Sequence, residues 1–545
     1  MAKIIPFSNN DDPHRNGAYA DEATNPMDGR FPGLFLHRLG LSDDQVSALI
    51  SGDPERYMQL FEIAAELRPG EEDTVAVLRL TRALLSAVGE REPMKATAKG
   101  NLPQAVVKEL SSGAFSGAEP WYVRVNREDD SFVLSWIRKL AQKAGLLALR
   151  KGVFRLTKAG RSAMEGAAWA RLYTRLMETH LRHPEVLHRF DRHEDDGAVA
   201  VSLPFLLFAA RDSTQEYLYE EDFAELLHAV DLGVYSSPEL LGEAIALRFF
   251  KRFAVPFGLV EPGPPFPPPV KTRDYLYYGF GRWERTERFD RMLHWRVDPP
   301  PRAAMPPPAA AARLMDSVHN EARGQIDGSE DSMIERYCLR AIERCPEDAD
   351  AYVVWARLFE RRPELALEIV ETGLAASRNQ EPDVPEGVSP WADHLFRDVL
   401  RLHFTRAEML QALGRLEEAF EEYERLLEMD PEDGIGARLY YVPALVEAGR
   451  YREAKRALGT VAADNLFSAP VWTAVLIEFA LGEYEAAEGL LKQAIEANPH
   501  TPRYLLSRYP PEPPPYYSPG DESEAEIYAD FARKAWRAVP GALDW

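Results

Sequence analysis

Apolar residues recur at every third or fourth position over most of this chain, and this spacing is typical of one buried face of an α-helix. The clearest N-terminal case is residues 74–88, with apolar side chains at Val75, Val77, Leu78, Leu80, Leu84, Leu85 and Val88. Two short strand-like stretches, 146–149 and 153–157, flank Arg150-Lys151-Gly152, where glycine can adopt the positive φ of a hairpin turn. The pattern therefore predicts a mainly α-helical fold with few strands.

Residues 91–161 and the helix before them arrange these elements in a particular order. The helix over 74–88, a short helix, a longer helix over 131–144 and the hairpin follow one another. Three helices followed by a two-stranded wing is the order of a winged helix-turn-helix. The segments Leu156-Thr157-Lys158-Ala159-Gly160 and 97–103 also resemble winged-helix domains of uncharacterised bacterial proteins.

Residues 162–298 are again helical in pattern, and their C-terminal part is similar to the layout just described. The stretch 238–253 runs into Pro256-Phe257-Gly258-Leu259-Val260-Glu261, much as the earlier long helix runs into its glycine and strand. Residues 288–297 have a strand-like composition, and proline-rich 262–269 is expected to form a long wing loop. We therefore expect a helical domain here, with a second, degenerate winged helix as the alternative.

A short phrase occurs three times in the C-terminal half of the chain. The copies are 413–419, 448–454 and 481–487, and each has glycine at its second position and alanine at its seventh. Their glycines are spaced 35 and then 33 residues apart. This period, with glycine at a helix turn and a small alanine where two helices approach, is the tetratricopeptide repeat pattern. Such helical pairs stack into a curved array with a concave, partner-binding surface.

The end of this array resembles a second known family. Asn498-Pro499-His500-Thr501-Pro502-Arg503-Tyr504-Leu505-Leu506 and Gly520-Asp521-Glu522-Ser523-Glu524-Ala525 are similar to paired segments of the suppressor-of-tumorigenicity-seven family. The resemblance implies partner binding and no known chemistry. This chain lacks the membrane-spanning segments of that family's animal members, so the resemblance carries over only the repeat architecture.

These patterns divide the chain, which at 545 residues is too long for one core, into six segments. We expect a disordered tail (1–33), a helical entry with a winged helix (34–161), a helical domain (162–298), a proline- and alanine-rich linker (299–313), a tetratricopeptide-like array (314–509) and an extension with a capping helix (510–545). The expected fold class is mainly α, with winged-helix-like modules before an α-solenoid.

Composition narrows the class and the location of the protein. An apolar content of 46% supports packed domains, and the net charge of −23 argues against a protein that coats nucleic acid or anionic membrane over its whole surface. The N-terminus lacks the apolar core of a signal peptide, and the longest apolar run, 198–210, is broken by Ser202 and Pro204. Cys338 and Cys345 are expected to be reduced core residues. We expect a cytoplasmic, bacterial protein with no membrane contact.

One region carries the opposite charge. Residues 91–161 contain 14 Lys and Arg against 6 Asp and Glu, a net charge of +8, which leaves −31 for the rest of the chain. The candidate phosphate contacts are Arg138, Lys139, Lys143, Arg150, Lys151, Arg155 and Lys158. However, Glu128-Asp129-Asp130 precedes the helix over 131–144 and would repel phosphate at the end that normally enters the major groove. We therefore favour a structural or protein-contact role over DNA binding.

The sequence shows no catalytic signature. Four histidines and two carboxylates gather in one region: His180, His183, His188, His193, Asp191 and Glu194. Pro184 interrupts the helix between them and no metal-binding spacing is present, so a solvated helix end is favoured over a metal site. No nucleophile, phosphate-binding loop or acid–base pair has the matching spacing. We expect no catalytic, cofactor-binding or metal site.

Two features of the repeats concern the partner. Positions that hold Lys and Asn in repeats binding acidic chaperone tails hold Phe404 and Glu408 here, so a carboxylate clamp is not expected. Tyr440, Tyr441 and Trp472 suggest a groove for an apolar or extended peptide, although packing between repeats is favoured for them. Our leading hypothesis is a non-enzymatic adaptor that binds a protein partner through the array. The alternative is a winged-helix DNA-binding regulator whose repeats act as a sensor.

Overall fold

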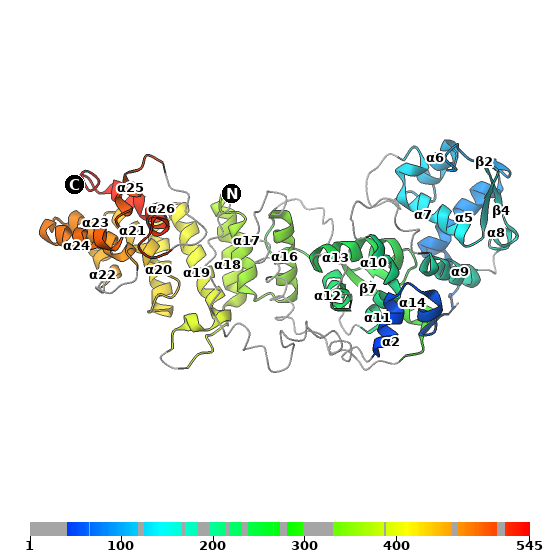
Figure 1. The fold of residues 1–545 in the computed structure, drawn as a ribbon, viewed down its shortest axis with the longest axis horizontal. Helices are drawn as coiled ribbons and strands as arrows, with labels where there is room; N and C mark the ends of the chain where they lie inside the picture. Colours follow the sequence, from blue (N-terminus) through cyan, green and yellow to red (C-terminus); the bar gives the residue numbers. More distant parts are fainter. Residues whose placement is uncertain are drawn as a thin grey trace. The chain divides into compact units, whose positions relative to one another are not determined.

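The computed structural model describes residues 41–64, 66–117, 125–165, 169–183, 196–212, 217–230, 238–264, 266–272, 281–297, 315, 331–385, 388–459, 467–509 and 518–545. The predicted tail and linker, 1–33 and 299–313, lie outside the described residues. The described residues are mainly helical with small antiparallel sheets (Figure 1), which confirms the predicted mainly α class. They fall into two compact units, the first made of 19–266 with 275–304, and the second of 267–274 with 305–545.

The first unit contains a module of helices around a three-stranded sheet, called the first module below. Its elements are α5 (Ala76–Gly89), β2 (Met94–Lys95), α6 (Gln104–Ser112), η2 (Glu128–Asp130), α7 (Phe132–Lys143), β3 (Leu147–Arg150), β4 (Val153–Leu156) and α8 (Lys158–Ser162). The strands pair antiparallel in the order β2-β4-β3. Lys151 and Gly152 between β3 and β4 have φ of 52° and 74°, which confirms the predicted hairpin and its use of glycine.

A second module in the same unit repeats this order of elements. It contains α11 (Leu203–Asp212), β5 (Leu218–Tyr219), α12 (Glu220–Val230), α13 (Pro238–Ile245), the π-helix η4 (Ala246–Ala254), β6 (Val260–Pro262), β7 (Arg282–Arg285) and α14 (Glu287–Met292). Its sheet has the order β5-β7-β6, so the last strand again lies in the centre. The strand prediction for 288–297 was wrong at its start, because 288–292 belong to α14. Part of the predicted wing loop, from Pro267 onward, belongs to the second unit.

The same turn links the long helix to the sheet in both modules. Gly145 and Gly258 follow the long helices, and each has a φ of 67°. Thr157 Oγ1 donates to the carbonyl oxygens of Gly145 and the next residue at 2.7 and 3.2 Å. Thr286 Oγ1 donates to the carbonyls of Gly258 and the next residue at 2.8 and 3.1 Å. The second module is therefore a structural repeat of the first.

Further elements join the two modules into one core. They are α2 (Asp43–Ile50), α3 (Pro54–Tyr57), β1 (Phe61–Ile63), α4 (Glu71–Thr74), α9 (Trp169–Arg182), α10 (Asp196–Val201) and β8 (Leu293–Trp295), which pairs with β1. Trp136 Nε1 of α7 donates to His180 Nδ1 of α9 at 3.3 Å, and the His180 ring stacks on Phe253 of η4. Burial lowers the pKa of His180 to about 3. The imidazole is therefore a neutral core group.

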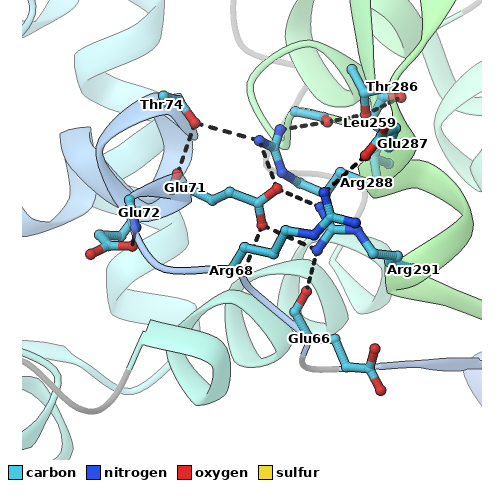
Figure 2. A network of polar contacts seen from close by, with 12 residues as sticks. Glu66, Arg68, Glu71, Glu72, Thr74, Leu259, Thr286, Glu287, Arg288 and Arg291 are labelled. Carbon is cyan, nitrogen blue, oxygen red and sulfur yellow. Dashed lines mark hydrogen bonds and ion pairs between the residues drawn. The ribbon is translucent and has the colours of Figure 1, made fainter.

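A polar network also connects the second module to the start of the first (Figure 2). The carboxylate of Glu71 lies between the guanidinium groups of Arg288 and Arg291 on α14. Arg68 pairs with Glu287 at 2.9 Å beside them. Burial raises the pKa of Glu71, but hydrogen bonds from Arg291 and Arg68 outweigh burial, so the pKa lies below its usual range. The network fixes α14 against α4, the short helix that precedes α5.

The second unit is an array of helical pairs. Its elements are α16 (Asp331–Arg344), α17 (Ala349–Arg357), α18 (Pro363–Ser377), η5 (Pro390–Ala392), α19 (His394–Ala412), α20 (Leu416–Met429), α21 (Arg438–Glu447), α22 (Tyr451–Leu458), α23 (Ala469–Leu481), α24 (Tyr484–Ala497), α25 (Thr501–Leu506) and α26 (Glu522–Ala538). The glycines of the repeated phrase, Gly414, Gly449 and Gly482, have φ of 73°, 75° and 81° between the helices of their pairs. Its alanines, at 419, 454 and 487, are fully buried. Both observations agree with the repeat prediction.

The space around two helical glycines predicts opposite effects of their substitution by alanine. A Cβ on Gly160 of α8 would lie 2.1 Å from the carbonyl oxygen of Leu146, whereas a Cβ on Gly489 of α24 would meet nothing within 4 Å. Gly160→Ala should lower the free energy of unfolding by about 1–3 kcal/mol through overpacking. Gly489→Ala should raise it by about 0.5–1 kcal/mol, because alanine favours the helix. Urea unfolding followed by circular dichroism measures both, and a Gly160→Ala protein as stable as the parent would contradict the packing described.

Candidate partner-binding surfaces of the array

The first helices of the pairs, α17, α19, α21 and α23, form what we call the inner face of the array. The C-terminal helix α26 packs on α21 and α23 at this face (Figure 1). The buried side of α26 consists of Ala525, Tyr528, Ala529, Ala532, Ala535 and Trp536, none of which is more than 4% exposed. Its alanines allow close approach of the helices, so α26 closes this part of the inner face.

A buried carboxylate holds α26 in this position. Glu524 is 3% exposed and accepts hydrogen bonds from the Ser468 amide (2.6 Å), the Gly520 amide (2.7 Å) and Asn498 Nδ2 (3.1 Å). Asn498 Nδ2 also donates to the Asp521 carbonyl oxygen at 2.9 Å. We call this group of residues the latch. The latch brings together the two segments, around 498 and 520, that resemble the suppressor-of-tumorigenicity-seven family.

The three aromatic residues predicted as a partner groove pack within the array. Trp472 is 2% exposed, and its ring lies 6.3 Å from that of Trp536 on α26. Tyr441 is 3% exposed, and its hydroxyl donates to Glu424 at 2.7 Å. Tyr440 is half-buried, with its ring 5.2 Å from that of Phe531 on α26. All three side chains therefore make packing contacts within the array.

Charged side chains of α17 and α19 pair with each other on the rest of the inner face. Arg401 contacts Asp350 at 3.0 Å and Asp398 at 3.1 Å. Burial and the nearby Asp350 carboxylate raise the pKa of Asp398 to about 7. Arg357 forms an ion pair with Glu408, the position that was expected to exclude a carboxylate clamp. Arg357 and Arg401 are thus committed to carboxylates of the array.

A pocket of about 560 Å³ opens on the other side of α19, between the second helices α18 and α20; we call it the outer pocket. Its apolar walls are Leu374, Phe396, Val399 and Met429. At its base, the Glu422 carboxylate contacts both His403 and Arg406. Burial raises the pKa of Glu422, but His403 and Arg406 outweigh burial, so the pKa lies below its usual range. The base of the pocket is therefore a fixed, ionised group.

The rim of the outer pocket differs from its base. Arg378 after α18 and Arg425 on α20 are exposed, and neither forms a hydrogen bond or ion pair with another residue that the structure describes. Glu421 on the rim is likewise exposed and unpaired among the described residues. The sequence did not predict this pocket, because its lining comes from three helices on which charged residues look like ordinary solvated positions. The outer pocket combines apolar walls with charges that have no partner among the residues that the structure describes.

In the first unit, the structure separates the predicted phosphate contacts into two groups. Arg138 is 6% exposed, and its Nε donates to Glu128 at 2.6 Å. Glu128 is itself buried and accepts from the Leu102 amide at 2.7 Å. Arg138 therefore anchors the start of α7, and we remove it from the candidate phosphate contacts. The other candidates lie on α7 (Lys139, Lys143) and around the hairpin (Arg150, Lys151, Arg155, Lys158).

The predicted histidine group is described only in part. His180 lies in the core and His183 follows the end of α9, whereas His188, His193, Asp191 and Glu194 lie outside the described residues. Within the described part of the chain, no cluster of His, Cys, Asp and Glu side chains could hold a metal ion. Cys338 and Cys345 are free and buried, and burial raises the pKa of both thiols.

Comparison with known families identifies one region of the chain. The tetratricopeptide repeat family matches residues 410–476, from the end of α19 into α23, which confirms the repeat prediction there. The search of curated proteins found no match. Over the residues that the structure describes, no helix combines the length and the apolar character needed to cross a bilayer.

The latch predicts a large effect of one isosteric substitution. Glu524→Gln replaces an oxygen acceptor with an amide donor that faces backbone N–H groups, so it should lower the free energy of unfolding by about 2–3 kcal/mol. Asn498→Ala removes one donor of the same group and should cost about 1–2 kcal/mol. The matched control, Glu485→Gln, alters an exposed carboxylate of α24 and should stay within about 0.5 kcal/mol. Urea unfolding measures all three, and equal stability of Glu524→Gln and Glu485→Gln would contradict the latch.

Proposed function

We propose that this chain is a non-enzymatic adaptor whose tetratricopeptide-like array binds a protein partner in the outer pocket. The observation that carries the proposal is a pocket of about 560 Å³ with apolar walls and, at its rim, two arginines that pair with no other described residue. Pockets of this size and composition are typical of binding sites. An extended segment that places an acidic side chain beside an apolar one would satisfy both the arginines and the walls.

The base of the pocket favours binding without rearrangement. Because Glu422 is held by His403 and Arg406, its side chain loses little further freedom when a ligand arrives. Glu421 on the rim offers an acceptor for a backbone N–H of the bound segment. The pocket thus supplies apolar contact, cations and one acceptor within a single concave surface.

The state of the inner face supports the choice of the outer pocket. The latch holds α26 over α21 and α23, where it buries Trp472. A partner could use the predicted groove of Tyr440, Tyr441 and Trp472 only after α26 had left. The outer pocket requires no such step.

The first unit does not contain the proposed partner site. We infer that both modules are winged helices, which the order of their elements and their shared turn support, but a fold does not fix a function. A bacterial, cytoplasmic origin and kinship with the suppressor-of-tumorigenicity-seven family stay predictions from the sequence. The alternative function, a winged-helix DNA-binding regulator with the array as its sensor, would require nucleic-acid contact by the first unit.

Affinity capture with rim variants tests the adaptor. The double variant Arg378→Glu, Arg425→Glu should lose at least one protein that the parent chain enriches, with recovery falling about tenfold or more, because two cations at the pocket are reversed. The matched control, Arg452→Glu with Arg456→Glu, makes the same charge change at exposed positions of α22 and should keep that protein. Quantitative mass spectrometry of the captured proteins provides the measurement.

Two outcomes would count against the proposal. If the same proteins were recovered with both double variants, the outer pocket would not be the partner site. If the parent chain enriched no protein over an unrelated bait, the adaptor function itself would be refuted. Circular dichroism of each variant verifies that the helical array remains folded.

A further inference from the structure

The sheet of the first module gathers cations that are distant in sequence on one face. Lys95 of β2 and Arg150 of β3 both lie opposite Val153 of β4, one on each side of it. Arg155 is two residues along β4, so its side chain lies on the same face as that of Val153. The alternate residues Phe154 and Leu156 are buried against the helices. The outer face of this sheet therefore presents Lys95, Arg150 and Arg155 to solvent.

Two more cations border this face. Lys151 lies at the hairpin tip and Lys158 in the first turn of α8, and both are exposed. None of the five cations forms a hydrogen bond or ion pair with another residue that the structure describes. The nearby carboxylate of Glu92 is bound by Arg161 at 2.6 Å, and this hydrogen bond, with a smaller contribution from the charge of Arg155, lowers the pKa of Glu92. We call these five residues, Lys95, Arg150, Lys151, Arg155 and Lys158, the basic sheet face.

The helix that would normally read bases is not available in this protein. Seven of the twelve residues of α7 are buried. At its start, the Arg252 guanidinium of the second module lies 3.9 Å from the centre of the Phe132 ring. The Trp136 ring packs edge-on against Phe257 of the same module. Because the second module covers the N-terminal part of α7, this helix cannot place that part in a major groove.

The acidic residues before α7 also have structural partners. Asp130 accepts hydrogen bonds from the amides of Asn126 and Arg127 at 3.0 and 2.8 Å. Asp129 accepts from Asn101 Nδ2 at 2.9 Å, and Glu128 is buried with Arg138. None of these carboxylates belongs to the strands of the sheet. The repulsion expected at the helix start therefore does not apply to the outer face of the sheet.

We propose that the basic sheet face binds the phosphate backbone of duplex nucleic acid without reading its sequence. Neighbouring strands are about 4.8 Å apart, so the cations form a two-dimensional set that can reach several phosphates at once. Arginine binds phosphate through paired N–H groups, and a duplex carries one charge per about 1.7 Å along its axis. Contacts limited to the backbone give affinity without base discrimination. This activity is independent of the proposed adaptor function.

The strongly negative remainder of the chain confines binding to this face. Residues outside 91–161 carry a net charge of −31, so on balance they repel a duplex. Five phosphate contacts predict that log K falls against log salt concentration with a slope of about −4.5. Binding should therefore be strong near 50 mM salt and weak near 200 mM. Two duplexes of unrelated sequence should bind with equal affinity.

Fluorescence anisotropy of the full chain with a short DNA duplex tests the proposal. The triple variant Lys95→Glu, Arg150→Glu, Arg155→Glu should bind at least about tenfold more weakly, and its salt slope should be smaller by about 3, one for each lost phosphate contact. The matched control, Arg452→Glu, Arg456→Glu, Lys534→Glu, makes the same change in net charge at exposed positions of the array. The control should keep most of the affinity and the full slope.

Three results would overturn the proposal. The first is no binding of the duplex by the parent chain at low salt. The second is an equal loss of affinity in both triple variants, which would show only the effect of net charge. The third is displacement of the duplex by poly-L-glutamate at equal charge concentration, which would identify the face as a site for acidic proteins. The substituted side chains point away from the core, so the variants should fold. Circular dichroism verifies this.

Discussion

Burial of the Glu524 carboxylate is the constraint on which the second unit depends. A buried charge is tolerated only when hydrogen bonds replace its hydration, and here the donors come from the loop before α23, the residue after α24 and the residue before Asp521. The carboxylate can be satisfied only when α26 lies against α23. The apolar side of α26 is then buried, and the inner face of α21 and α23 is closed. The C-terminal helix therefore completes the array and does not extend from it as a separate tail.

In the first unit, packing between the two modules and one buried ion pair decide which surfaces stay exposed. Its two modules contain the same kind of turn and contribute to one core. The N-terminal part of α7 packs against the second module through Phe132 and Trp136. Arg138 and Glu128 satisfy each other inside this core. Lys95, Arg150 and Arg155 lie on the strands of the sheet, where strand register and not helix periodicity places them on one face. The second module thus covers the N-terminal part of α7 and leaves the outer face of the sheet exposed.

Local chemistry made part of this structure predictable from the sequence. Positive φ at Gly152 and Gly414 and the small size of Ala419 leave few alternatives, so the hairpin and the repeats could be recognised from short segments. Tertiary contacts could not be recognised in this way. Lys95 joins Arg150 only through the order of the strands, Arg138 looks like any surface arginine until Glu128 is placed beside it, and the outer pocket needs three helices at once. The role of the paired segments around 498 and 520 likewise appeared only when the fold joined them.

The central claim is that α26 is part of the inner face of the array. Hydrogen exchange of backbone amides in the full-length protein tests it most directly, because exchange reports the free energy of opening for each helix. The account predicts that the amides of α26 are as strongly protected as those of α21 and α23 and lose protection together with them in low denaturant. Rapid exchange of α26 while α21 and α23 stay protected would contradict the claim.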